Sequence, residues 1–511
     1  MIVEPIGVVT LVAGLLCLIA GLPFATFALL ISTLFGASAA LILPAFGNAN
    51  VQPAHLLLVF FVATALTRGI GPKALIRVVQ YPRPGFWLAL TVLYGAVSAY
   101  YFPRLFWGMT EVFGLRTDSG GNVVLTPLAP TSGNITQTVY LFGDLACFLL
   151  LCAYASSGAA AKRVLGQAVL ACGAANLCFA FLDLATYASH TTELMSPIRN
   201  ATYRLLDDVE TVGLKRIVGS FSEASAFGFA TLGLFAFAIR LWLEGVYERA
   251  AALVAIASLI ALTFSTSTTA YVGTAVFLVL TVLWSLGKMV AGRANPQIVA
   301  FVLTIPVVIG VITLVVLLNT PLRLYLEDAI NTVFVTKLSS SSGIERSAWN
   351  AQALTNFFDT YGVGGGVGSL RASSFVIAVL GSIGVAGLIL YGIFILGVLV
   401  PVGPAAAKQL RLSVALQRAA RSACVALLIA ASLTGALVDL GLQFFALAAL
   451  ACAKPDLKAV AQRWLGAPAG GLGQSWSGLS PGPATQRGSR IGETVARSSA
   501  GTPSTSARAF K

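Results

Sequence analysis

The sequence predicts an all-α, polytopic transmembrane helical bundle of about 12 to 14 helices. Only 10% of its 511 residues are charged and 57% are hydrophobic, whereas a soluble domain carries about 25% charged residues. Apolar runs recur along the chain, and each is long enough to cross ~30 Å of hydrocarbon as a helix. These runs are continuous, as in 375–400, and do not alternate over about 10 residues as barrel strands do.

The apolar runs define the expected membrane segments. The break at Gly21-Leu22-Pro23 is weak, so the first two segments are the least separate. The N-terminus has no basic region of the kind that begins a cleavable signal peptide, so we interpret its apolar run as a membrane segment. In order, the expected segments are 5–20, 23–45, 51–68, 85–107, 138–158, 164–187, 222–243, 250–266, 268–287, 297–318, 373–401, 422–437 and 439–453.

Charge predicts the orientation, because Lys and Arg accumulate on the cytoplasmic side of a membrane. Six regions of the chain hold 22 of the 32 Lys and Arg residues and only four of the 19 acids: 68–84, 159–163, 240–249, 288–296, 402–421 and the tail 454–511. The alternation of segments places 108–137, 188–221 and 319–372 on the opposite face. We therefore expect a multi-pass protein of the bacterial inner membrane with a cytoplasmic C-terminus and two larger periplasmic loops, 188–221 and 319–372.

Composition divides the chain into a transmembrane helical domain, 1–455, and a cytoplasmic tail, 456–511. From about Gly466 the tail is rich in Gly, Ser, Pro, Thr and Ala, so it cannot bury a core and is expected to be disordered. Its basic residues favour attraction to membrane lipids of the anionic inner leaflet, and we expect no nucleic-acid partner. The seven cysteines lie in apolar runs without a C-x-x-C pair, so they indicate buried hydrophobic side chains and no metal site.

The first periplasmic loop places basic residues just before a membrane helix. Arg204 lies within this loop and Arg216 near its end, and Glu223 opens the following helix. The unpaired N–H groups and the dipole at a helix N-terminus favour anions, and arginine donates two parallel hydrogen bonds to a phosphate. A diphosphate at the membrane surface would fit these features. Equally, the arginines could serve only as ion-pair partners of loop acids: Asp207, Asp208, Glu210 or Glu345.

The second periplasmic loop repeats this arrangement. Arg346 lies in its middle, and a glycine-rich run containing Gly364, Gly366 and Ser369 leads to Arg371 and the next helix. The run lacks the Gly-Lys-Ser/Thr of a phosphate-binding loop and the βαβ context of a dinucleotide fingerprint. Two interpretations stay open, a tight turn into the helix and a nest of backbone amides that binds an anion.

A few further polar residues lie in or beside the apolar runs. Asp144, Asp183 and Asp439 fall within or near the outer third of their segments, where a structural role is at least as plausible as a functional one. The Ser/Thr cluster 263–269 sits at an outer turn, where it could bind sugar or phosphate or satisfy backbone groups. His55 lies in an apolar run and is expected in the core.

Two stretches resemble the O-antigen polymerase and ligase superfamily. The first is Arg216-x-x-Gly219-x-Phe221-Ser-Glu-x-Ser225 before a helix, followed by the Ser/Thr-rich turn near residue 265. The second is Glu345-Arg346-x-x-Trp349 with the later alternating glycines, Gly362 to Ser369. The resemblance covers roughly residues 50–455 and depends mainly on the order and topology of these motifs.

The resemblance implies a metal-independent glycosyltransferase of the GT-C type with no cofactor, acting outside the inner membrane on undecaprenyl-diphosphate-linked oligosaccharide. Possible further partners are a chain-length regulator and a flippase. It implies catalytic roles for Arg216 and Arg346, with Glu223 as an orienting group or proton acceptor. Arg371, Arg204, Gly364, Gly366 and Ser369 are the expected substrate-binding residues.

The chain departs from the ligases of this superfamily. Ligases resemble one another in a late histidine in the outer loop, but 319–372 contains no histidine, and Ser373-Ser374 stand where a His-Asn pair often appears. This departure favours a polymerase of exopolysaccharide, capsule or O-antigen. Two rival functions stay open, a ligase that transfers glycan to lipid A core or protein, and a transporter or flippase of envelope glycans. Transporters often show internal repeats and polar midplane sites, and the sequence shows no convincing repeat.

Overall fold

The computed structural model describes residues 2–44, 49–117, 123–201, 210–211, 214–320, 324, 341–400 and 411–454. All of them belong to one compact unit, Met1–Leu457. The expected disordered tail, 456–511, lies outside the described residues.

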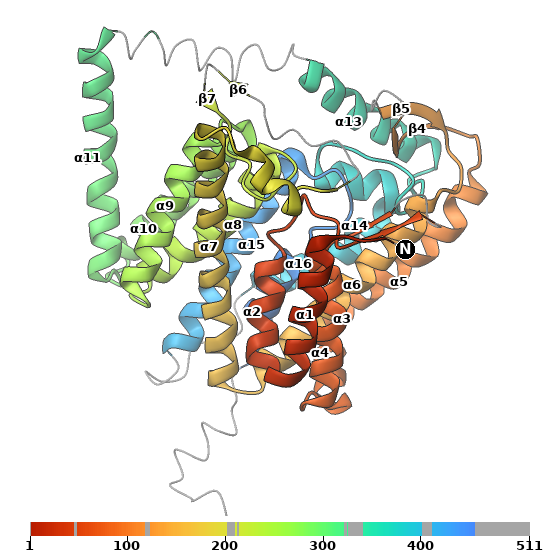
Figure 1. The fold of residues 1–511 in the computed structure, drawn as a ribbon, viewed down its shortest axis with the longest axis horizontal. Coiled ribbons are helices and arrows are strands. Elements are labelled where there is room, and N and C mark those ends of the chain that lie inside the picture. The colour runs from red at the N-terminus through yellow and green to blue at the C-terminus, as the bar shows by residue number, and fades with distance from the viewer. Residues whose placement is uncertain are drawn as a thin grey trace, which may run out of the picture. The chain divides into compact units, whose positions relative to one another are not determined.

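Helices dominate this unit, and each expected membrane segment overlaps one of them (Figure 1). Two helices lie outside the expected segments, α4 (Pro72–Val79) and α13 (Ser341–Asp359). The others are α1 (Pro5–Ala20), α2 (Leu22–Ser32), α3 (Pro53–Thr67), α5 (Pro84–Leu105), α6 (Ser132–Ser156), α7 (Ala159–Ala188), α8 (Ala224–Leu243), α9 (Glu248–Phe264), α10 (Thr268–Val290), α11 (Pro296–Leu318), α14 (Phe375–Leu399), α15 (Arg411–Thr434) and α16 (Leu442–Cys452).

Helix length confirms a multi-pass, all-α membrane architecture. Within the described residues, eight helices are long and apolar enough to cross a membrane, and a ninth span results if α3 and α4, bent by 116°, are counted together. Three apolar helices are shorter: α1, α2 and α16. At ~1.5 Å per residue, the 11 residues of α2 and of α16 reach only about half of a ~30 Å hydrocarbon layer. The count of full-length spans is therefore below the expected 12 to 14.

The second expected segment, 23–45, is wrong as a continuous helix. α2 ends at Ser32, and the chain then leaves helical geometry until β2 (Leu41–Leu43). β2 pairs antiparallel with β1 (Ile2–Val3) and β3 (Ala49–Val51). Tertiary hydrogen bonds replace the helical ones in between: the Ala37 amide donates to the Ser220 carbonyl, and the Ser38 hydroxyl donates to the Ile198 carbonyl. This non-helical segment is thus tied to the first long loop, 188–221.

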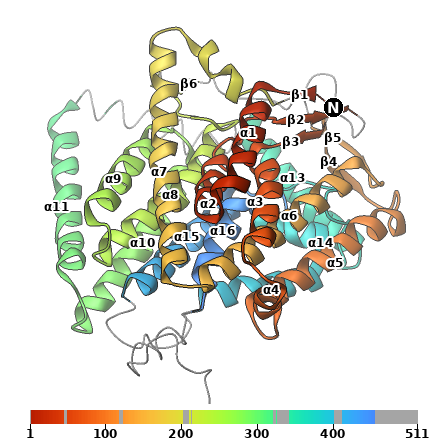
Figure 2. The ribbon, with the colours of Figure 1, turned by 60° about the horizontal axis from the view of Figure 1, so that its bottom comes forward.

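Irregular and short elements gather at one end of the bundle (Figures 1 and 2). They include the hairpin β4 (Glu111–Thr117) and β5 (Val123–Pro127), the 3-10 helix η2 (Thr192–Ile198), the pair β6 (Glu210–Thr211) and β7 (Leu214–Lys215), and helix α13. These elements come from the three regions that were expected outside. Arg371 joins two of the regions, because its amide donates to the Phe113 carbonyl in β4.

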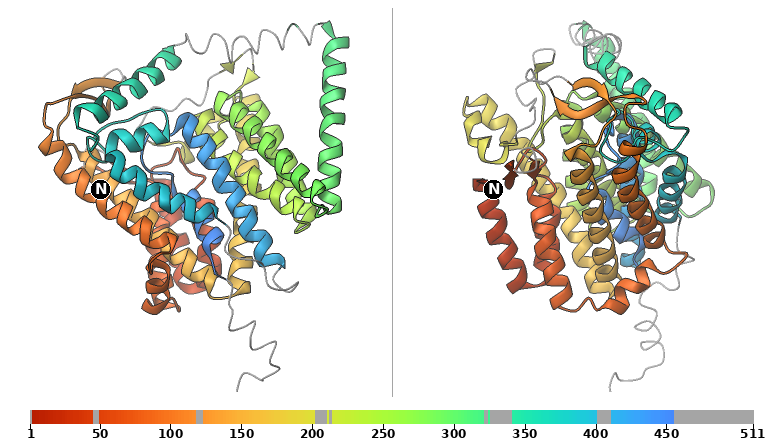
Figure 3. Two further views of the ribbon diagram at one scale, coloured as in Figure 1. Left: turned by 180° about the vertical axis from the view of Figure 1, so that it is seen from behind. Right: turned by 90° about the vertical axis from the view of Figure 1, so that its right-hand side faces the viewer.

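The basic connections meet at the opposite end of the bundle. Glu244, which follows α8, pairs with Arg240 at 2.8 Å and with Arg418 at 2.9 Å. Asn295, which precedes α11, donates to the Leu243 carbonyl at 2.7 Å. The two sets of connections that the charge pattern separated therefore lie at opposite ends of the bundle, as Figure 3 shows from two further directions.

Helix α8 lies in the interior of the bundle and leads into the core from the end where the long loops gather. It packs against α15 on one side and α9 on another, and its aromatic residues Phe227, Phe235 and Phe237 are buried. Most of its length is apolar, so the burial of this surface anchors it firmly. Its N-terminus therefore offers a fixed platform at Glu223, the residue before its first turn.

Candidate functional site

A buried carboxylate in α7 shapes the segment that enters α8. Asp183 accepts hydrogen bonds through Oδ2 from the amides of Val218, at 2.8 Å, and Gly219, at 2.9 Å. Its Oδ1 pairs with Arg199 at 2.6 Å and lies 3.7 Å from the Lys215 ammonium. The three charged side chains are at most 5% exposed. Asp183 therefore has the structural role that the sequence left open: it holds the backbone just after Arg216 and the side chain of Lys215 just before it.

Arg216 is a half-buried cation among other charged groups. Burial lowers the pKa of Arg216 below its ordinary value, nearby Glu223 raises that pKa, and nearby Arg346 lowers it. Its Nε is buried and has no hydrogen-bond partner among the described residues. A buried, unmatched N–H is costly unless a ligand or water meets it, so this guanidinium has an unused donor.

Arg371 approaches the same carboxylate from the second loop. Burial lowers the pKa of Arg371, and nearby Glu223 and Glu345 raise it. Its guanidinium lies over the Trp349 ring, 4.4 Å from the ring centroid, an attractive cation–π arrangement. Within the part of the chain that the structure describes, its Nε likewise has no hydrogen-bond partner.

The two long loops, 188–221 and 319–372, therefore approach each other at the N-terminus of α8. We call Arg216, Arg346, Arg371 and Glu223 the arginine cluster; Glu223 lies within electrostatic range of Arg216 and Arg371, and Arg346 within range of Arg216. Glu223 also accepts a hydrogen bond from the Ser225 hydroxyl. With Glu345 near Arg371, three cations face two carboxylates, and the remaining excess of positive charge suits an anionic ligand.

Several predicted residues cannot be placed in this cluster. Arg204 lies outside the described residues, as do Asp207 and Asp208, two of the loop acids that could have paired with the arginines. Among the remaining loop acids, Glu345 lies near Arg371, and the side chain of Glu210 is outside the described part.

The glycine run has a packing role in this structure. Gly366 and Gly368 have positive φ angles of 94° and 79°, and a Cβ on Gly368 would lie 2.3 Å from the Gly133 carbonyl oxygen. The amides of Gly364 and Gly366 donate to the Thr360 hydroxyl and the Ser382 carbonyl. Because these donors are already used by protein atoms, the run is a close-packed turn and not an open anion nest.

Ser369 also contacts protein. Its hydroxyl accepts a hydrogen bond at 2.8 Å from the side-chain amide of Asn134 in α6. The same side-chain amide donates to the Val367 carbonyl at 2.7 Å. Gly364, Gly366 and Ser369 therefore hold the second loop against α5, α6 and α14, and any contact of theirs with a substrate stays a prediction.

A cavity of about 400 Å³ adjoins the arginine cluster. Glu223 belongs to both, and Ser225, which donates a hydrogen bond to Glu223, also lines the cavity. The Ala372 amide, next to Arg371, donates to the Ala436 carbonyl in the loop beside the cavity. The irregular segments after α2 and before α16 contribute Thr33, Gly36, Gly435, Leu437 and residues 439–441. Irregular backbone at membrane depth is tolerated where it lines a water-filled space. Here the irregular segments next to the half-length helices α2 and α16 line such a cavity.

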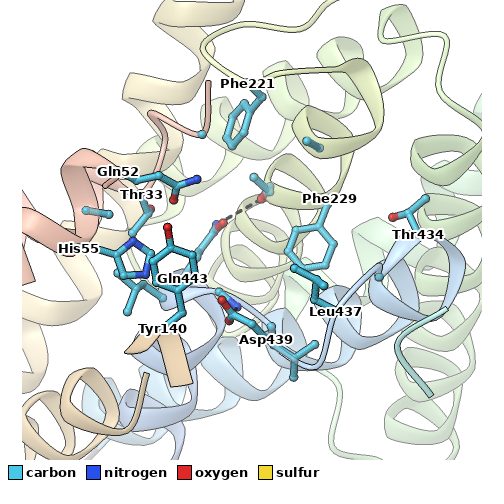
Figure 4. A pocket seen from close by; sticks show the side chains of 18 of the residues that line it. Thr33, Gln52, His55, Tyr140, Phe221, Phe229, Thr434, Leu437, Asp439 and Gln443 are labelled. Carbon is cyan, nitrogen blue, oxygen red and sulfur yellow. Dashed lines mark hydrogen bonds between the residues drawn. The ribbon is translucent and has the colours of Figure 1, made fainter. Parts of the chain in front are cut away.

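The polar lining of the cavity includes residues that sequence reasoning missed. His55, expected in the core, instead lines the cavity and stacks on Tyr140 with ring centroids 4.3 Å apart. Figure 4 shows these two rings together, with Asp439 beside Gln443. The signal for Asp439 was an acid between two apolar runs, but its partners come from elements far apart in the sequence.

The Ser/Thr turn between α9 and α10 lies near the arginine cluster. Tyr271, one turn into α10, is within electrostatic range of Arg216, and its hydroxyl donates to the Thr263 carbonyl at 2.7 Å. The hydroxyl oxygens of Thr266 and Thr268 are buried without a partner among the described residues. Sugar or phosphate binding by this turn stays a prediction.

No group of three His, Cys, Asp or Glu side chains in the described ranges could hold a metal ion. No model of a known protein family matches the chain, and comparisons with curated proteins and with solved structures also find no match.

Proposed function

We propose that this protein polymerises lipid-linked oligosaccharide repeat units at the outer face of the bacterial inner membrane, as a GT-C-like, metal-independent glycosyltransferase. The observation that carries the proposal is the arginine cluster beside a cavity of about 400 Å³. Pockets of about 300–1,000 Å³ suit small organic ligands, and the cluster supplies the positive charge that a diphosphate needs.

The proposed chemistry divides the work between the two parts of the site. A hydroxyl of the acceptor glycan attacks the anomeric carbon of the donor, a new C–O bond forms, and the bond from that carbon to the lipid diphosphate breaks. Negative charge grows on the departing diphosphate, where Arg216, Arg346 and Arg371 would stabilise it. Preorganised charge of this kind is often the largest single catalytic contribution; here Asp183 holds the backbone just after Arg216, and the Trp349 ring lies against the Arg371 guanidinium.

The test is elongation by the purified, reconstituted protein. Wild-type protein supplied with a short undecaprenyl-diphosphate-linked oligosaccharide should produce longer lipid-linked chains. Arg216→Ala and Arg346→Ala should each reduce the rate by about 10²-fold or more, the size expected when one charge-stabilising donor is removed. Arg104→Ala is the matched control, because Arg104 lies on the last turn of α5 at the same end of the bundle and contacts only Tyr100 and its carbonyl among the described residues.

Other outcomes would replace the proposal. Elongation at the wild-type rate by both alanine variants would refute the role of the cluster. Transfer of glycan to lipid A core or protein, without lengthening of the lipid-linked chain, would identify a ligase. Movement of lipid-linked glycan between the leaflets of a vesicle, without any new glycosidic bond, would identify a flippase.

A further inference from the structure

A second group of ionisable side chains lies at the cavity, apart from the arginine cluster. Asp144 is the thirteenth of the 25 residues of α6 and is 0% exposed. Because α6 begins at Ser132, six residues before the expected segment, Asp144 lies near the middle of the helix and not in its outer third. Its two carboxyl oxygens accept no hydrogen bond from any described residue.

The nearest charged neighbour of Asp144 is a second carboxyl group. Asp439, in the loop before α16, lies within hydrogen-bonding reach of Asp144 and accepts the Gly441 amide through Oδ1 at 2.5 Å. No Lys or Arg in the described ranges forms an ion pair with either carboxyl group. Two ionised carboxylates near each other repel, and each can only accept hydrogen bonds, so a single proton held between them would relieve the repulsion and supply the missing donor.

The remaining titratable groups around the pair come from three helices. His55 of α3 is within electrostatic range of Asp439, and both of its ring nitrogens are buried without a partner among the described residues. Tyr391 of α14 is near both carboxyl groups, and its hydroxyl likewise has no partner in the described part of the chain. Cys147, one turn after Asp144 on α6, is near Asp144.

Only one member of the pair borders the cavity. Asp439 and His55 line it, whereas Asp144 is enclosed by protein. We propose that Asp144 and Asp439 form a proton-binding site that holds one shared proton at neutral pH and exchanges protons with the cavity through Asp439. Carboxyl pairs that share a proton titrate as a unit and keep one proton at a pH where an isolated Asp is ionised.

The site has a use in the reaction, and this use rests on the proposed function. As the acceptor oxygen bonds to the anomeric carbon and the diphosphate leaves, the hydroxyl O–H bond breaks, and the pair takes that proton through Asp439, the member that borders the cavity. The pair is then neutral and releases one proton to water in the cavity. Glu223 lies among the arginines that would face the diphosphate, where it is placed to orient them.

Infrared difference spectroscopy tests the site without any activity. Wild-type protein in lipid vesicles should show the C=O stretch of a protonated aspartic acid at neutral pH, identified by ¹³C-aspartate labelling. Asp144→Asn should abolish this band, because it removes the carboxyl group with which Asp439 shares the proton. Asp439→Asn should shift the band to higher frequency, because an amide oxygen accepts a weaker hydrogen bond than a carboxylate does. Asp359→Asn is the control, because Asp359 lies on α13 and accepts from Thr110.

The spectra can overturn the proposal in three ways. No protonated aspartic acid band in the wild type at neutral pH would remove the site, whatever the variants do. A band that Asp439→Asn leaves unchanged would mean that the proton is not shared. A band that disappears when choline chloride is replaced by sodium chloride would mean that the pair binds a small cation in place of a proton.

Elongation assays then separate the site from the proposed function. A slower elongation by Asp439→Asn, about 10²-fold or more, with unchanged donor binding, supports the proton-accepting role. Wild-type elongation by this variant, together with the expected spectra, would leave the proton site standing and refute its role as base. Absence of elongation by the wild type would refute the proposed function alone.

Discussion

Asp183 offers a direct test of how the arginine cluster is held in place. Replacing it by alanine removes the carboxylate that pairs with Arg199 and Lys215 and that accepts the amides of Val218 and Gly219. Two cations, each at most 5% exposed, would then lack this partner. Breaking a buried ion pair from one side costs about 3–5 kcal/mol. Asp183→Asn keeps one acceptor oxygen for the amides and should cost less than Asp183→Ala.

The measurement is unfolding of the purified protein in detergent, with elongation measured in parallel. Glu244→Ala is the matched control at the opposite end of the bundle, because its ion pairs with Arg240 and Arg418 are more exposed; partly exposed pairs contribute ~1 kcal/mol or less. Asp183→Ala should therefore lose much more stability than Glu244→Ala. Equal losses, or a loss below about 1 kcal/mol for Asp183→Ala, would refute the view that this carboxylate organises the loop.

Two further predictions concern the second loop. Gly368→Ala should destabilise the protein by about 2 kcal/mol or more, from backbone strain and overpacking, because its φ is 79° and the added Cβ would lie 2.3 Å from a carbonyl oxygen. Gly392→Ala, in α14 with nothing within 4 Å of its Cβ, should be neutral or slightly stabilising, and equal melting of the two variants would contradict the packing role. Trp349→Leu should raise the donor KM more than it lowers stability, since it removes the ring beneath Arg371; unchanged kinetics with Trp349→Leu would show that the ring does not position this arginine.

The sequence alone predicted most of the helices, because continuous apolar runs are a strong signal in a chain with so few charges. It also predicted that the loops with excess Lys and Arg and the loops without it lie at opposite ends. It could not predict the end of α2 at Ser32, because the run 23–45 stays apolar after that residue and the tertiary partners of residues 37 and 38 lie in a distant loop. For the same reason, the approach of Arg216, Arg346 and Arg371 to one another could only be a hypothesis.

The pairing of Asp144 with Asp439 could not be predicted from the sequence, for a different physical reason. Asp144 and Asp439 are each surrounded by apolar residues in the sequence, and His55 lies in an apolar run of its own. Hydrophobic patterns indicate which segments are buried in membrane or protein. They do not indicate which side chains of separate segments point at one another. Only the packing of α3 and α6 with the loop before α16 brings these side chains together.

The half-length helices α2 and α16 affect how the membrane voltage acts on this protein. An applied potential falls across the part of a membrane that excludes water, and each elementary charge moved through it changes energy by ~2.3 kcal/mol per 100 mV. The irregular segments beyond α2 and α16 line a cavity that reaches between the helices. The applied potential therefore falls mainly across the remaining thickness of protein, from the bottom of the cavity to the other face. A charged donor could thus enter the cavity to its full depth at nearly the potential of the outer solution, and its binding should be insensitive to voltage.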